Sequence, residues 1–147
     1  MFMLKINKLA IPITAVAAFA MSSVYYSPIV LGNVLRSVDP VAGVAMTPSP
    51  VKGLGEIART VAITYVLAHL ITLLGSTGWR QRVSLALWIW FGFSALMWAG
   101  AIMWEGTPWQ VAAIHSGDWL LKTLLISVLL GMLAPKEYSH GERQANG

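Results

Sequence analysis

The hydrophobic positions of this chain fall into four long apolar stretches separated by short polar segments. The stretches cover Leu9 to Leu31, Ile57 to Gly75, Val83 to Trp104 and Trp109 to Ala134. Each is close to the roughly 20 residues that an α-helix needs to cross a hydrocarbon core of about 30 Å. The pattern therefore predicts an all-α fold: a single membrane domain of residues 1–147, built as an integral membrane bundle of four transmembrane helices.

The polar segments between these stretches predict how neighbouring helices are connected. The first, SVDPVAGVAMTPSPVKGLG, is rich in Pro, Gly and Ser, and a loop is expected over 37–55. The second, STGWRQR, is short and basic. The third, EGTP, is a tight turn that makes the last two helices antiparallel neighbours. Residues 136–147 are polar and are expected to form a disordered tail.

The N-terminal segment allows two interpretations. MFMLKINKLAIPITAVAAFAMSS combines two lysines, an apolar run and an AFA triplet, which is typical of a signal peptide cleaved after Ala20. Apolar character continues beyond that site through VYYSPIVLG, so a retained first helix is favoured. Pro28 then requires either a kink or a helix end at Tyr25 and Tyr26 followed by a turn.

Composition supports the membrane assignment and narrows the classes of function. Apolar residues (AVILMFWYC) make up 56% of the chain and charged residues only 11%, against about 25% charged in a typical soluble domain. Cysteine is absent, which excludes disulfides, thiolate metal sites and cysteine nucleophiles. The net charge of +4 is spread through the connections, a pattern that argues against nucleic acid as a partner.

The distribution of positive residues predicts the orientation, because Lys and Arg near helix ends are retained in the cytoplasm. One side of the predicted bundle holds six of them: Lys5, Lys8, Arg80, Arg82, Lys136 and Arg143. The other side holds three: Arg36, Lys52 and Arg59. Both termini are therefore expected in the cytoplasm, with the long first loop and the EGTP turn outside.

Three ionisable side chains interrupt the last apolar stretch. His115, Asp118 and Lys122 recur at spacings of three and four, so they lie on one face of a helix. Lys122 is 13 residues from Trp109, which places it roughly 20 Å from that end and near the bilayer centre. Asp118 precedes Lys122 by four residues, the favourable order for an ion pair, and pairing lowers the cost of burying either charge.

A polar stripe inside a membrane is expected to face a polar surface. The second apolar stretch carries Tyr65, His69 and Thr72 at the same spacings, so this face is predicted to meet the stripe. Tyr25 and Arg36 belong to a similar stripe on the first helix if that helix continues past Pro28.

The tryptophans of the third stretch and the acid of the EGTP turn are expected to have structural roles. The third stretch carries bulky aromatic residues that are expected to face lipid in the main: Trp88, Trp90 and Trp98. Glu105, in the EGTP turn, is interpreted as a cap for the N-terminus of the last helix, where a negative charge complements the helix dipole. A carboxylate at an entry point is the alternative role for Glu105.

Short motifs resemble a known family. YYSPIVLG after the first apolar run, and WEGTPWQVAAIHSGDWLLKTLLISVLLGML at the end, are similar to small bacterial four-helix membrane proteins catalogued as domain of unknown function 1761. Departures from the family's pattern fall at Tyr25, His115, Ser116 and Asp118. The resemblance implies a multi-pass protein of the bacterial inner membrane, and it implies no mechanism because the family has no assigned activity.

Two functional hypotheses follow from the stripe. One is proton- or ion-coupled transport of a small solute through a homo-oligomer, with a dimer favoured, because four helices leave little room for an aqueous path. The alternative is a membrane scaffold or accessory subunit, in which Asp118 and Lys122 form a structural ion pair and a membrane protein is the partner.

An enzyme is the least favoured class. His69, His115 and Asp118 are a ligand set compatible with zinc or non-haem iron, but no HExxH-like spacing occurs and Lys122 would oppose a cation. No metal, cofactor or catalytic residue is therefore predicted.

Overall fold

The computed structural model describes residues 9–39, 49–75 and 78–133, and within these ranges every regular element is a helix. Four spans are long and apolar enough to cross a membrane: Ala10–Val38, Pro50–Leu73, Trp79–Glu105 and Trp109–Met132. The predicted all-α bundle of four transmembrane helices is thereby confirmed. The predicted tail at 136–147 lies outside the described residues, and the orientation of the termini stays a prediction.

The first span is interrupted at the proline that the sequence singled out. Helix α1 (Ala10–Tyr25) ends before Ser27, whose backbone is extended (φ −62°, ψ 152°), as residues preceding proline prefer. A wide turn η1 (Pro28–Gly32) and the short helix α2 (Asn33–Val38) then complete the span. A Cβ at Gly32 would lie 2.5 Å from the Tyr26 carbonyl oxygen, so this turn depends on glycine. Of the two arrangements considered for Pro28, the structure has the helix end at Tyr25.

The second span starts earlier than predicted. Helix α4 covers Pro50–Leu73, with Ser49 as its N-cap accepting a hydrogen bond of 3.2 Å from the backbone N–H of Lys52. The expected loop over 37–55 is therefore wrong at both ends, since residues 37–38 end α2 and 50–55 are helical; residues 40–48 lie outside the described part. Pro at the first helical position after a serine cap favours a helix start, and here it outweighs the glycines that follow.

The third span also begins before its predicted start. Helix α5 (Trp79–Ile89) continues through the π-helical segment η2 (Trp90–Ala95) into α6 (Leu96–Glu105). Most of the basic STGWRQR segment is thus the first turn of α5 and not a connection. Gly106 (φ 68°) ends α6, and helix α7 (Trp109–Met132) follows after Pro108.

Glu105 does not have the predicted capping role. It is the last residue of α6 and is exposed, while α7 has Pro108 at its N-cap position, no side-chain cap and no acidic residue in its first turn. Because three residues separate the two helices, the Glu105 carboxylate does not cap the N-terminus of α7.

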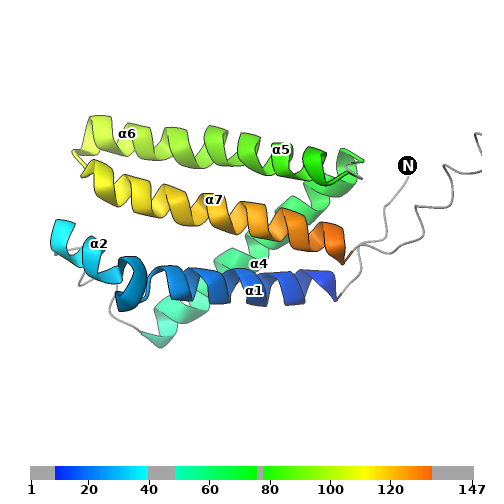
Figure 1. Cartoon of the computed structure of the whole chain (residues 1–147), viewed down its shortest axis with the longest axis horizontal. Coiled ribbons are helices and arrows are strands. Elements are labelled where there is room, and N and C mark those ends of the chain that lie inside the picture. Colours follow the sequence, from blue (N-terminus) through cyan, green and yellow to red (C-terminus); the bar gives the residue numbers. More distant parts are fainter. Residues whose placement is uncertain (1–8, 40–48, 76–77, 134–147) are drawn as a thin grey trace, which may run out of the picture.

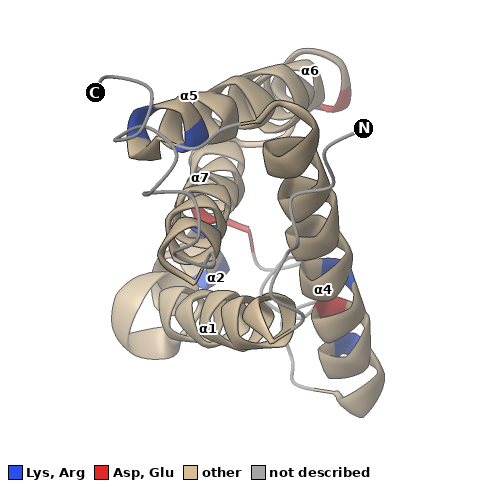
Figure 2. Ribbon diagram, turned by 90° about the vertical axis from the view of Figure 1, so that its right-hand side faces the viewer, with Lys and Arg blue, Asp and Glu red and all other residues tan. Residues whose placement is uncertain are grey.

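Helix α7 is the central element of the bundle. It packs against α1, α4 and α5. In an apolar 18-residue stretch of α7, 44% of the residues are buried, against 11% in the corresponding stretch of the third span. Seen from the side, α1, α7 and the α5–α6 span run alongside one another, and α4 crosses them obliquely (Figure 1). Viewed along the bundle, α5–α6 and α1 lie on opposite sides (Figure 2). Polar groups on α7 are consequently enclosed by helices from several directions.

Candidate functional site

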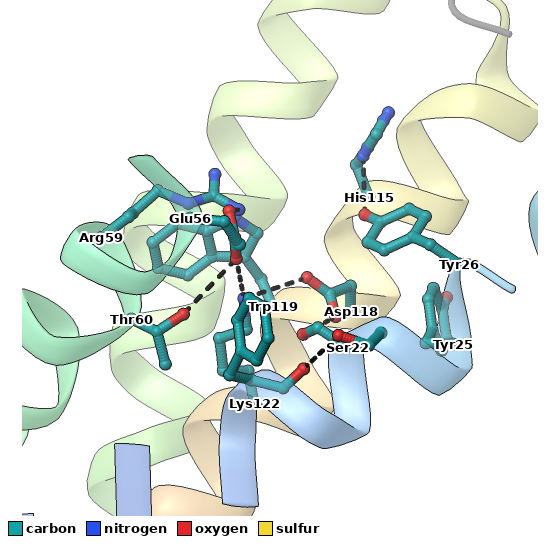
Figure 3. A network of polar contacts seen from close by, with 12 residues as sticks. Ser22, Tyr25, Tyr26, Glu56, Arg59, Thr60, His115, Asp118, Trp119 and Lys122 are labelled. Carbon is teal, nitrogen blue, oxygen red and sulfur yellow. Dashed lines mark hydrogen bonds and ion pairs between the residues drawn. The ribbon is translucent and has the colours of Figure 1, made fainter. Parts of the chain in front are cut away.

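Lys122 occupies the centre of α7 and is fully buried, with 0% of its side chain exposed. Its Nζ atom lies 2.7 Å from Oε1 of Glu56 on α4 and 3.5 Å from Oδ2 of Asp118, one turn earlier on α7 (Figure 3). The predicted pairing of Asp118 with Lys122 is therefore present. The shorter contact, however, is to a carboxylate on another helix.

Glu56 connects the buried lysine to a second cation. Its Oε2 atom pairs with Nη2 of Arg59 at 2.7 Å, and Oε1 also accepts a 3.4 Å hydrogen bond from the Thr60 hydroxyl. The Arg59 guanidinium lies over the ring of Trp119, 5.5 Å from its centroid. Glu56, Arg59, Asp118 and Lys122, which we call the charge network, thus balance two positive charges against two negative ones.

Exposure increases steadily along the charge network. The side chains of Lys122 and Asp118 are 0% and 1% exposed, whereas those of Glu56 and Arg59 are 29% and 48% exposed. The network therefore runs from the middle of the bundle to its outer surface, and Glu56 is the carboxylate at the point where it becomes accessible.

The inner end of the charge network is held by α1. The hydroxyl of Ser22 donates a 2.5 Å hydrogen bond to Oδ1 of Asp118. Within the described part of the chain, Oδ2 of Asp118 has no hydrogen-bond partner, so Lys122 at 3.5 Å is its main stabilising contact. Helices α1, α4 and α7 are thus joined through one polar centre.

A second polar group on α7 lies one turn from Asp118. Nδ1 of His115 shares a 2.8 Å hydrogen bond with the Tyr26 hydroxyl, and the His115 ring stacks on Trp98 with centroids 4.9 Å apart. We call Tyr26, Trp98 and His115 the histidine cluster. Tyr25, one of the predicted secondary residues, lies beside it and donates its hydroxyl to the carbonyl oxygen of Ile114 at 2.9 Å.

Two tryptophans predicted to face lipid instead face α7. Trp98 stacks on His115, and Nε1 of Trp90 donates to the carbonyl oxygen and the hydroxyl of Ser116 at 2.8 and 3.1 Å. Only Trp88 fits the expectation, with 70% exposure. An indole N–H in an apolar medium needs an acceptor, and the Ser116 carbonyl on the neighbouring helix provides one for Trp90.

The predicted face of α4 does not meet the stripe. The buried face consists of Thr60, Thr64, Leu67, Ala68 and Ile71. Tyr65 and His69 are exposed, with their rings stacked at 6.5 Å, and Thr72 bonds only to the Ala68 carbonyl of its own helix. At 100° per residue, a face centred on 64 and 68 turns 65 and 69 outward. The prediction placed the polar face on the wrong side of this helix.

The remaining predicted residues lie apart from both polar groups. Arg36 is exposed at the end of α2, and Glu105 is exposed at the end of α6. Within the described ranges, no group of three His, Asp or Glu side chains is placed to hold a metal ion. His69, His115 and Asp118 accordingly do not converge.

Glu56 was missed by the sequence analysis because it fell between the expected loop and the expected helix. Two signals could have found it. Ser49 followed by Pro50 indicates a helix start, and an acid at 56 followed by Arg59 and Thr60 places three polar groups on one helical face.

Gly117 allows the close approach of α1 to α7. A Cβ at this position would lie 2.7 Å from the Tyr25 hydroxyl. We expect Gly117→Ala to displace Tyr25 from Ile114 and to lower the free energy of unfolding by about 1–3 kcal/mol, the usual cost of overpacking. Denaturation by SDS in mixed micelles measures this. Gly100→Ala is the matched control: a Cβ there meets nothing within 4 Å, so it should be neutral or stabilising.

Comparison with known proteins supports the resemblance seen in the motifs. A family model described as "Protein of unknown function (DUF1761)" matches residues 9–131. The match includes the first three spans, the fourth span up to residue 131, and every residue of the charge network. No curated protein and no solved structure matches the chain.

Proposed function

The chain belongs to the DUF1761 family of proteins of unknown function, and from the geometry of its site we propose proton-coupled transport of a small solute across the membrane. The supporting observation is Lys122, fully buried between Glu56 and Asp118 on two different helices. Ionisable residues inside membrane spans commonly mark ion or substrate paths.

Protonation of Glu56 is the proposed coupling step. Its carboxylate now binds Lys122 through one oxygen and Arg59 through the other. A proton arriving on Glu56 neutralises it and weakens both ion pairs, so that Asp118 becomes the only charged partner of Lys122. The contact between α4 and α7 would loosen, and return of the proton to water would restore it. A proton thereby changes helix packing near the bilayer centre, which a proton-coupled carrier requires.

The histidine cluster supports a continuation of the path. His115 lies one turn from Asp118 on the same face of α7 and is bonded to the Tyr26 hydroxyl. Imidazole and phenol groups both accept and donate protons, so the cluster has the chemistry of a relay between Asp118 and the Trp109 end of α7.

The proposal includes a homodimer. Tyr65 and His69 form an exposed stacked pair within the α4 span, and polar side chains at this depth favour protein neighbours over lipid. A second copy packed on this face would cover them.

Proton flux in sealed liposomes tests the function. The purified protein is reconstituted with a trapped pH-sensitive dye, and a potassium gradient with valinomycin drives protons inward. We expect flux above that of empty liposomes, reduced to the empty-liposome rate by Glu56→Gln and partly retained by Glu56→Asp. Thermal unfolding of the same samples confirms that the variants are folded.

Glu105→Gln is the matched control, because it removes an exposed carboxylate outside the charge network. It should leave the flux unchanged. Equal flux in the parent and folded Glu56→Gln would refute the role of Glu56. A parent protein that moves no protons in this assay, which supplies no solute, would exclude uncoupled proton conduction through the network. Flux that stays absent with candidate solutes added would favour the second candidate function.

That second candidate is a scaffold or accessory subunit, and the closed charge balance of the network supports it. Two cations and two carboxylates neutralise each other without an added ion. A charge-balanced network between helices can serve to fix helix register alone. In that case the variants would change stability and association with a membrane partner, and proton flux would be absent throughout.

A further inference from the structure

A cavity of about 280 Å³ lies between α5 and α7, at the end of the bundle opposite the EGTP turn. Its lining combines aromatic, cationic, hydroxyl and apolar side chains: Trp79, Arg82, Ser127, Val128, Gly131 and Met132. We call it the Arg82 cavity. It shares no residue with the charge network or the histidine cluster.

Two polar groups are held in this cavity by the fold. The Arg82 guanidinium lies against Gly131, where a Cβ would collide with Nη1, so the glycine makes room for it. Ser127 is 0% exposed, and its hydroxyl has no hydrogen-bond partner among the residues that the structure describes. A buried hydroxyl is ordinarily satisfied, and in a helix the carbonyl four residues earlier is the usual acceptor. A hydroxyl without a protein partner in the lining of a cavity is a donor that a molecule bound there can engage.

The surroundings define the class of ligand. Arg82 is in the first turn of α5 and Gly131 in the last turn of α7, so the cavity lies at the depth where a span meets the lipid headgroups. Trp79, Val128 and Met132 are 69%, 42% and 74% exposed and offer an apolar wall to an acyl chain. A guanidinium matches phosphate in charge and geometry and keeps several donors when one is engaged.

We propose that the Arg82 cavity binds the phosphate group of an anionic phospholipid. Arg82 contacts the phosphate oxygens, the Ser127 hydroxyl donates to the phosphate or glycerol oxygens, and an acyl chain lies along Val128 and Met132. The lipid fills the space between α5 and α7 that side chains leave open.

Native mass spectrometry of the full-length protein in a non-ionic detergent tests this. Phosphatidylglycerol and phosphatidylcholine are titrated separately onto the parent, Arg82→Gln, Ser127→Ala and Arg80→Gln. We expect saturable binding of phosphatidylglycerol, weakened about tenfold or more by Arg82→Gln because a charge-assisted hydrogen bond is lost. Ser127→Ala should weaken it less, and phosphatidylcholine should bind more weakly to the parent.

Arg80→Gln is the matched control, since Arg80 lies over the Trp79 ring in the same turn of α5 but outside the cavity lining. It should leave phosphatidylglycerol binding unchanged. Equal binding to the parent, Arg82→Gln and Ser127→Ala would overturn the proposal. Displacement of the lipid by excess inorganic phosphate would assign the cavity to a soluble anion. If Arg82→Gln fails to fold, unchanged binding by folded Ser127→Ala alone refutes the site.

Discussion

Replacing Lys122 with Met is expected to lower the free energy of unfolding by about 3–5 kcal/mol, the cost of removing one partner from a buried ion pair. Methionine has a similar length and no charge, so packing is nearly kept and the electrostatic loss dominates. Two carboxylates lose their shared cation. Asp118, 1% exposed, retains only the Ser22 hydroxyl, whereas Glu56 retains Arg59.

SDS titration of the protein in mixed micelles measures this loss through helical content. Arg36→Met is the matched control, because Arg36 is an exposed cation in the last turn of α2, outside the charge network. That variant should lie within about 0.5 kcal/mol of the parent, as surface substitutions usually do. A Lys122→Met protein as stable as the control would mean that the charge network contributes nothing to folding.

The sequence predicted the last helix and its polar face well, because two independent signals coincide there. An apolar run of sufficient length defines the span, and His115, Asp118 and Lys122 interrupt it at spacings that only a helix places on one side. The structure has α7 over Trp109–Met132 with Asp118 and Lys122 buried. Within a membrane span, charged positions therefore carry more information than apolar ones.

The partner face on α4 could not be predicted for a related reason. In a soluble helix the apolar stripe marks the interior, but here Val61, Val66 and Leu73 are exposed on the surface that lipid would cover. Hydrophobicity then does not separate the inner face from the outer one. Tyr65, His69 and Thr72 were predicted to form the inner face because their spacings of four and three place them on one side of the helix, but packing turns Tyr65 and His69 outward.

The start of α4 shows a conflict between two local signals. Glycines at 53 and 55 and prolines at 48 and 50 favour a loop by composition, yet Ser49 and Pro50 are also the residues that begin a helix. The helix forms because the start at Ser49 and Pro50 is reinforced by tertiary contacts: Glu56 pairs with Lys122, and Thr60 is buried in the bundle. The local sequence pattern does not show long-range contacts of this kind. The predicted helix therefore started at Ile57 and did not include Glu56.

Adding Asp118→Asn to Lys122→Met is expected to recover most of the stability that Lys122→Met loses. The expected gain in the free energy of unfolding is about 2–3 kcal/mol, which lies within the range of couplings between contacting residues. Adding Glu56→Gln instead should recover little, although Glu56 makes the shorter contact to Lys122, 2.7 Å against 3.5 Å. The reason is burial. Without Lys122, Asp118 is an almost fully buried carboxylate with one hydroxyl partner, while Glu56 is 29% exposed and still paired with Arg59.

Double-mutant cycles in mixed micelles separate these couplings, with Lys122→Met, Asp118→Asn and Glu56→Gln measured singly and in pairs. Equal recovery from both additions would mean that Arg59 does not hold Glu56 once the lysine is gone. Greater recovery from Glu56→Gln would place the unpaired charge at the α4 end of the network and contradict the exposure gradient. Recovery by Asp118→Asn alone would mean that Lys122 is the counter-ion that Asp118 needs to stay charged in the bundle. Glu56, which is accessible and has two cationic partners, is then the carboxylate that can release one partner when it is protonated.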